Sequence, residues 1–144
     1  MKPERKGTDN KLTAMMQVRN EADRYLREVL DDLSEYVDEI VIVDDASTDD
    51  TVQICRSYPK IVALERSTAS LYGVNEAVLK RRLFTRTAAT APDWILAIDA
   101  DELFEPRAHT RLREMINQTH TDWYSFRFFH FWRSRTHYRV DKLW

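Results

Sequence analysis

The chain has little of several features that would assign a function directly. Among its 144 residues there is one cysteine, Cys55, and there are only two glycines. A single cysteine excludes an intramolecular disulfide and is compatible with a reducing compartment. We expect Cys55 to be a small buried residue of a helix. The sequence contains no Gly-x-Gly-x-x-Gly and no Gly-Lys-Ser/Thr segment, which excludes a glycine-rich phosphate cradle.

Long apolar runs and a strong excess of one charge are also missing. No apolar run approaches the ~18 residues that a membrane span needs, so we predict no transmembrane segment. Residues 1–11 are polar and lack the apolar centre of a secretory signal, so we expect them to form a disordered leader. The net charge of −2 provides no basic field for nucleic acid. These features favour a cytoplasmic protein and leave peripheral membrane association open.

The composition is sufficient for one domain, over residues 12–144. Apolar residues make up 43% of the chain, ample for a single core. The chain closes at Trp144 in a stretch still rich in aromatic and basic residues, so we expect it to be cut inside a fold, as the amino-terminal part of a longer catalytic domain. The histidines have no zinc-ligand spacing, and we expect them on surfaces: His109, His120, His130 and His137.

Apolar periodicity predicts strands that alternate with helices. The expected strands are 12–18, 40–43, 61–64, 94–98 and an aromatic one at 123–132. The expected helices are 21–36, one capped by Ser47-Thr48-Asp49 that ends near Tyr58, then 75–89 and 106–118. Such alternation is typical of an α/β fold with a mostly parallel sheet covered by helices on both faces.

Two acidic clusters follow apolar strands. Asp44 and Asp45 follow strand 40–43, and Asp99 and Asp101 follow strand 94–98. Parallel sheets bind ligands beyond the carboxyl ends of their strands. On an extended chain Asp99 and Asp101 would face one side, about 6.6 Å apart, and could reach Mg²⁺ or Mn²⁺ that also binds phosphate oxygens. Asp44 or Asp45 could accept a base N–H or a ribose hydroxyl. The plainer alternative is solvated loop acids.

Three segments resemble motifs of family 2 glycosyltransferases, which have the Rossmann-like GT-A fold. Val43 to Thr51 is similar to Val-Asp-Asp-Gly-Ser-x-Asp-x-Thr, Arg19-Asn20-Glu21 matches an Asn-Glu pair after the first strand, and Ile98 to Glu102 matches an Asp-x-Asp motif. The match covers residues 12–105. The resemblance implies transfer of a sugar from a UDP-, GDP- or dTDP-linked donor to a carbohydrate, lipid or protein acceptor. It also implies inversion at the sugar and dependence on Mn²⁺ or Mg²⁺.

The resemblance also implies roles for individual residues. Asp45, or Asp44 in its place, would contact the base. Asp99 would reach the ribose or a metal-bound water and is counted with Asp101 as a metal ligand. Asp101 would bind the metal directly.

Four further residues of these motifs complete the expected nucleotide site. Asn20 and Glu21 would shape its wall, and Ser47 and Ala100 would line it.

The chain also departs from the family pattern. Ala46 stands where the motif has glycine, so the tight turn must be adjusted. The helix at 75–89 lacks the usual Asn-Gly and carries four basic residues that could meet a phosphate or form a solvated face: Lys80, Arg81, Arg82 and Arg86. The inverting step needs a base. After Asp122 the only acid is Asp141, in no recognisable motif. The catalytic base is therefore unknown, and turnover by this chain alone stays open.

Other functions remain as alternatives. The aromatic and basic residues of 126–144 could complete the core or contact a sugar or diphosphate. A non-catalytic nucleotide-sugar-binding domain fits the same motifs. A Mg²⁺-binding receiver domain is disfavoured because a strand and a helix precede Asp44. An Asp-x-Asp phosphatase is disfavoured because Leu103 stands where a small hydroxyl residue is expected.

Overall fold

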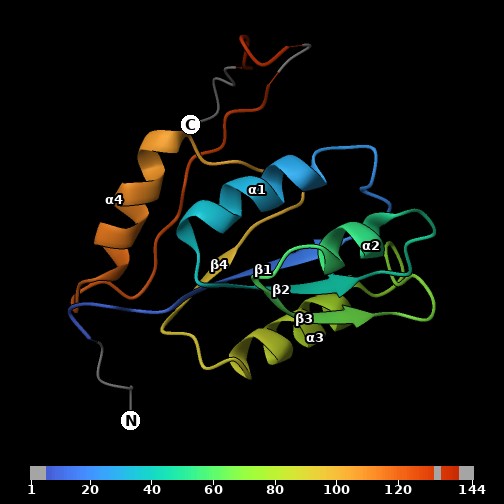
Figure 1. The fold of residues 1–144 in the computed structure, drawn as a ribbon, viewed down its shortest axis with the longest axis horizontal. Coiled ribbons are helices and arrows are strands. Elements are labelled where there is room, and N and C mark those ends of the chain that lie inside the picture. Colours follow the sequence, from blue (N-terminus) through green and yellow to red (C-terminus); the bar gives the residue numbers. More distant parts are fainter. Residues whose placement is uncertain (1–5, 132–133, 140–144) are drawn as a thin grey trace.

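The computed structural model describes residues 6–131 and 134–139. Four strands alternate with four helices in the described part of the chain (Figure 1). The strands are β1 (Leu12–Val18), β2 (Glu39–Asp44), β3 (Ile61–Arg66) and β4 (Trp94–Ala97). The helices are α1 (Leu26–Tyr36), α2 (Thr51–Arg56), α3 (Glu76–Ala88) and α4 (Pro106–Ile116).

The strands form one parallel sheet with the order β3-β2-β1-β4. In the register, Val18 of β1 pairs with Asp44 of β2, and Met15 of β1 pairs with Ala97 of β4. Strand β2 is buried at every position after Glu39. Its run of isoleucine and valine suits a strand covered on both faces, because branched side chains pack well on a pleated surface. The expected α/β architecture is confirmed.

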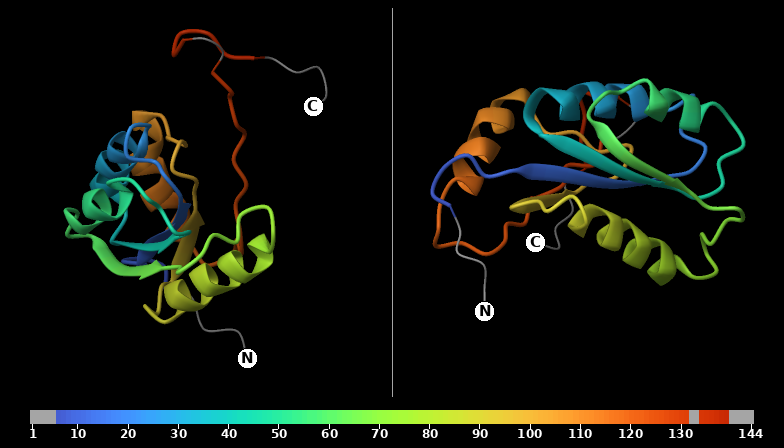
Figure 2. Two further views of the ribbon diagram at one scale, coloured as in Figure 1. Left: turned by 90° about the vertical axis from the view of Figure 1, so that its right-hand side faces the viewer. Right: turned by 60° about the horizontal axis from the view of Figure 1, so that its bottom comes forward.

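Each face of the sheet has its own core. Helices α1, α2 and α4 lie on one face and α3 lies on the other (Figure 2, right). Ile40 and Ile42 of β2 belong to the first core, whereas Val41 and Val43 pack with α3 in the second. Cys55 is fully buried in the first core, as expected. Burial, with a smaller effect from the Asp44 charge, raises the pKa of its thiol to about 12, which makes it unreactive at neutral pH.

Several element boundaries differ from the sequence prediction. Helix α1 begins at Leu26, not at Glu21, because residues 22–25 form turns. Helix α2 ends at Arg56, before the predicted Tyr58. Its N-cap residue, Asp50, makes no side-chain capping hydrogen bond. The carboxylate of Asp49 nevertheless accepts the Thr51 N–H at 3.0 Å, so part of the expected capping chemistry is present.

The predicted aromatic strand at 123–132 is wrong over its described residues, 123–131. This segment contains only an isolated antiparallel bridge from Phe131 to Tyr138. It leaves the α/β body after α4 (Figure 2, left). Alternating aromatics favour a strand, but a strand needs a neighbouring backbone, and here the contact with edge strand β4 is between side chains: Tyr124 stacks on Trp94 at 5.5 Å.

The aromatic side chains of this segment do not complete the core either. Residues Trp123, Phe128 and Phe131 are 73%, 60% and 61% exposed. Phe126, in edge contact with Phe104 at 4.8 Å, is 39% exposed. Trp132 and residues 140–144, which include Asp141, lie outside the described residues.

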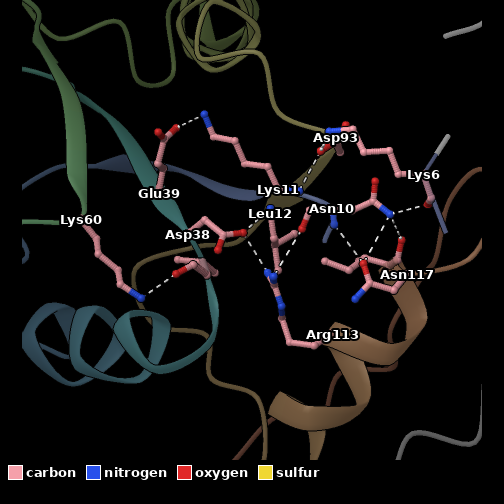
Figure 3. A network of polar contacts seen from close by, with 12 residues as sticks. Lys6, Asn10, Lys11, Leu12, Asp38, Glu39, Lys60, Asp93, Arg113 and Asn117 are labelled. Carbon is pink, nitrogen blue, oxygen red and sulfur yellow. Dashed lines mark hydrogen bonds and ion pairs between the residues drawn. The ribbon is translucent and has the colours of Figure 1, made fainter. Parts of the chain in front are cut away.

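A polar network ties the segment before β1 to the amino end of the sheet (Figure 3). The Asn10 side chain is buried, and its Nδ2 donates to the Ile116 carbonyl at 3.0 Å. Arg113 of α4 donates to the Asp38 carboxylate at 2.8 Å. The Asp38 carboxylate also accepts the Leu12 N–H at 2.7 Å. Packing of the domain therefore begins before residue 12, where the sequence suggests a leader.

One histidine, His109, departs from the expected surface position. His109 stacks on Tyr36 at 4.4 Å, and its Nε2 lies 2.9 Å from a carboxylate oxygen of Asp32. His120, His130 and His137 are exposed. No helix in the described part of the chain is long and apolar enough to cross a membrane.

Candidate nucleotide site

The end of β2 places the first acidic cluster, and the structure buries it. Asp44 and Asp45 are both 0% exposed. The chain then turns at Ala46, whose φ of +57° lies in the left-handed region. The Ser47 N–H closes this turn by donating to Asp44 Oδ2 at 3.1 Å. Arg66 of β3 holds the turn from the side, with its Nε 3.5 Å from Asp44 Oδ2 and its Nη2 donating to the Ser47 carbonyl at 2.7 Å.

Asp45 is held by the segment between β3 and α3. Its carboxylate accepts the Ser70 hydroxyl at 2.7 Å, the Leu71 N–H at 2.8 Å and the Tyr72 N–H at 3.1 Å. Arg19 Nη1 lies 3.7 Å from the same carboxylate. Burial alone would raise the pKa of Asp45, but these hydrogen bonds and the Arg19 charge together lower it. Asp45 is thus a buried and stably ionised carboxylate.

The end of β1 joins the loop that follows β2. Asn20, with φ of +51°, donates its N–H to Ser47 Oγ at 2.9 Å and accepts the Thr48 N–H on its Oδ1 at 2.8 Å. The Glu21 N–H donates to Thr51 Oγ1 at 2.8 Å. Asn20 and Ser47, both predicted site residues, are therefore brought together, and their hydrogen bonds fix the two loops to each other.

The end of β4 carries the second acidic cluster in a turn. Strand β4 ends at Ala97, and the Glu102 N–H donates to the Asp99 carbonyl at 3.1 Å. The Glu102 carboxylate in return accepts the Asp99 N–H at 2.9 Å. Asp99 and Asp101 are exposed, whereas Ala100 is 5% exposed and packs in the core. The spacing expected for an extended chain does not apply here, because residues 100 and 101 lie in the turn.

The sequence suggested that the two acidic clusters lie side by side, but the structure separates them. Strand β1 lies between β2 and β4, so two strand spacings, about 10 Å, separate them. Glu21 follows β1, the strand between the two clusters. Its pKa is raised mainly by burial and further by the charges of Asp101 and Asp49, against the lowering effect of Arg24. Glu21 and Asp101 are thus close enough for their charges to interact.

The exposed carboxylates suit a metal that a substrate helps to hold. Within the described ranges, no group of three or more His, Cys, Asp and Glu side chains could hold a metal ion. Mg²⁺ and Mn²⁺ do not need such a group, since one or two carboxylates suffice when phosphate oxygens and water complete the shell. Asp99 and Asp101 offer that donor set. Glu102 beside them has a raised pKa, mainly from burial and then from the charges of Asp99 and Asp101.

Sequence reasoning missed two residues that shape the β2 end. In the sequence Arg19 stands out only as part of a motif, whereas in the structure it contacts both the Asp45 carboxylate and the Ser70 hydroxyl. Ser70 lies in the long connection after β3, where no periodicity marks it. A cation next to the Asn-Glu pair was the only signal available for Arg19, and the sequence held none for Ser70.

Comparison with known proteins identifies the family. Residues 13–144 match the family model described as Glycosyl transferase family 2. The chain belongs to glycosyltransferase family 2. It is also 31% identical, over 116 residues, to the uncharacterized proteins Rv3786c of Mycobacterium tuberculosis and Mb3815c of Mycobacterium bovis. The matched region covers 78% of this chain and spans 28% of the length of each of these relatives.

Solved glycosyltransferase structures share the fold. Staphylococcus aureus TarS 1-349 superposes with a TM-score of 0.60 at 21% identity, over 74% of this chain and 32% of that one. Its complex with UDP gives 0.54 at 23%, over 65% and 28%. The mannosyltransferase PcManGT of Pyrobaculum calidifontis, solved with GDP-Man and Mn²⁺, gives 0.54 at 24%, over 78% and 33%. The fold of this family 2 domain is GT-A.

Proposed function

We propose that this family 2 domain binds a nucleotide-sugar donor and serves a glycosyltransferase that inverts the sugar and depends on a divalent metal. The observation that carries the proposal is the order of groups along the carboxyl edge of the sheet. Buried Asp44 and Asp45 lie at β2, Asn20 and Glu21 at β1, and exposed Asp99 and Asp101 at β4.

This order corresponds to the parts of a nucleoside diphosphate, in which a ribose separates the base from the phosphates. We assign the base to the β2 end, where polar groups are buried and fixed. The ribose lies at the β1 end, between Asn20 and Glu21, with Ser47 behind them. The diphosphate lies at the β4 end, where Asp101 and Asp99 hold a Mn²⁺ or Mg²⁺ ion and Ala100 packs the turn against the core.

The metal would supply the charge stabilisation that sugar transfer requires. A divalent ion neutralises a diphosphate and stabilises it as a leaving group. The protein's part is to hold that ion with Asp101 and Asp99, and to fix the nucleotide through the joined loops after β1 and β2. The solved neighbours are bound to UDP in one case and to GDP-Man with Mn²⁺ in another, which supports a nucleoside diphosphate as the ligand. We expect the donor to be a UDP-, GDP- or dTDP-linked sugar and the acceptor to be a carbohydrate, lipid or protein hydroxyl.

Isothermal titration of the chain with UDP, GDP and dTDP, each with and without Mn²⁺, tests the proposal. We expect one diphosphate to bind with an affinity that requires Mn²⁺. Asp101→Asn should then lower that affinity at least tenfold, about 1.4 kcal/mol. Glu114→Gln on α4, which removes an exposed carboxylate outside the site, is the matched control and should bind as the wild type does. Equal Mn²⁺-dependent affinity in wild type and Asp101→Asn would contradict the metal assignment.

A further inference from the structure

Exposed aromatic residues gather on one segment after α4. We call its described residues, 123–131 and 134–139, the aromatic arm. The exposed aromatic residues of the arm are Trp123, Phe126, Phe128, Phe129, Phe131 and Tyr138. Proteins that work alone in water rarely expose so much contiguous apolar surface, and such a surface usually marks a binding site. The arm extends beyond the α/β body (Figure 2, left), so a large, flat partner can reach it.

The aromatic arm is fastened to the body near both of its ends. The Tyr124 hydroxyl donates to the Met115 carbonyl of α4 at 2.8 Å, and the Tyr124 ring stacks on Trp94 of β4. Farther along the chain, the Arg135 guanidinium donates to the Glu28 carboxylate of α1. The exposed rings between these contacts are therefore carried on a loop that is held at two points.

The charge of the aromatic arm is of one sign. The arm contains three arginines and no aspartate or glutamate, although the whole chain has a net charge of −2. The Arg127 guanidinium lies over the Phe129 ring, 5.3 Å from its centroid, so a cation and an apolar ring share one patch. Arginine binds phosphate oxygens through paired hydrogen bonds, and Trp and Tyr favour the boundary between hydrocarbon and head groups. This combination is complementary to an anionic lipid surface.

The pattern of exposure favours lipid over a protein partner. Phe128 and Phe129 are consecutive in the sequence and are 60% and 53% exposed. A protein that pairs with an extended chain takes up every second side chain in its pockets, which would leave one of these two rings in water. The fluid boundary of a bilayer has no fixed pockets and takes up both rings.

We propose that the aromatic arm docks this domain onto a membrane surface that contains anionic lipid. Its rings lie at the level of the head groups, and Arg127 binds lipid phosphate. The contact is peripheral, because the arm lies on the bilayer and does not cross it. The inference is independent of the proposed function, since no residue of the arm belongs to the proposed nucleotide site.

Co-sedimentation of the intact chain with lipid vesicles tests the proposal. Vesicles of phosphatidylcholine alone are compared with vesicles that also contain phosphatidylglycerol. Each arginine near an anionic surface strengthens binding about fivefold, so we expect at least about tenfold stronger binding to the anionic vesicles. Raising the salt concentration should weaken that binding, because salt screens exposed charges. The tryptophan emission should shift to the blue on binding, as Trp123 leaves water.

Two pairs of matched variants locate the contact. Phe128→Ser should lower the affinity for anionic vesicles at least about tenfold, because an exposed ring is no longer withdrawn from water. Phe84→Ser, at a similarly exposed ring on α3, should leave the affinity unchanged. Arg127→Gln should lower the affinity about fivefold. Arg56→Gln, at an exposed position on α2, should not lower it.

Far-UV circular dichroism checks that each variant keeps the α/β fold, and Phe131→Ser takes the place of Phe128→Ser if that chain unfolds. Absence of vesicle binding, or equal binding to neutral and anionic vesicles, would overturn the inference. An equal loss in Phe84→Ser and Phe128→Ser would also overturn it, because the arm would then not be the contact. Self-association that depends on the arm, without vesicle binding, would assign the arm to a second copy of the chain instead. Each of these results leaves the proposed nucleotide site intact.

Discussion

Ala46 stores strain at the centre of the β2 turn, and a glycine there should stabilise the protein. The φ of +57° at Ala46 crowds its Cβ against the backbone, which costs about 1–2 kcal/mol for a residue with a side chain. Glycine avoids this cost but loses about 0.5–1 kcal/mol through its more flexible unfolded chain. The difference predicts that Ala46→Gly raises the free energy of unfolding by about 0.5–1 kcal/mol, or roughly 2–4 °C in Tm.

Urea unfolding followed by circular dichroism measures this change. Ala91→Gly, at φ of +51°, should give a gain of similar size, because the same backbone strain is relieved. Ala77→Gly, at an exposed position in α3, should instead cost about 1 kcal/mol, since glycine is a poor helix former. A neutral or destabilising Ala46→Gly, alongside a stabilising Ala91→Gly, would refute the claim that the turn at Ala46 is strained.

Three further changes test the site and the core. The pKa of Glu21 is raised in the folded state, so the ionised side chain destabilises the fold at neutral pH. The free energy of unfolding therefore rises as pH falls through that raised pKa towards the unfolded value of 4.5. Glu21→Gln should therefore be more stable than the wild type at pH 7, with the gap closing near pH 4.5; a less stable variant in pH-dependent unfolding would contradict this. Asp101→Ala should leave Tm in the absence of ligand nearly unchanged, because its side chain is exposed, yet abolish Mn²⁺-dependent nucleotide binding by titration. Leu79→Ala, in the fully buried core under α3, should cost about 2–5 kcal/mol in urea unfolding, whereas Phe84→Ala, at a half-exposed ring on the same helix, should cost far less.

The sequence was most informative where burial leaves little choice. The Ile-Val-Ile-Val run of β2 can be buried only in a strand covered on both faces, and β2 lies where that pattern predicts. Helix α3, at Glu76–Ala88, lies within a residue of the predicted range 75–89 at each end. The aromatic run at 123–131 failed because a β-type pattern does not by itself supply a pairing strand.

The sequence points to candidate residues at three strand ends but not to their spatial order. Strand order depends on long-range pairing, so the insertion of β1 between the two acidic clusters could not be seen in the sequence. The same holds for the burial of Asp45, since its partners Ser70, Leu71 and Tyr72 lie 25 to 27 residues later in the chain. The roles of Asp99 and Asp101 as metal ligands stay predictions.

Thermal unfolding with UDP, GDP, dTDP and ADP, each with and without Mn²⁺, tests the central claim most directly. A ligand at 100 times its Kd stabilises the folded state by about 2.7 kcal/mol, which is readily visible in Tm. We expect one of UDP, GDP and dTDP to raise Tm only when Mn²⁺ is present, which would show that the domain binds a nucleoside diphosphate together with the metal. An unchanged Tm with all four nucleotides would contradict a donor site on this edge of the sheet.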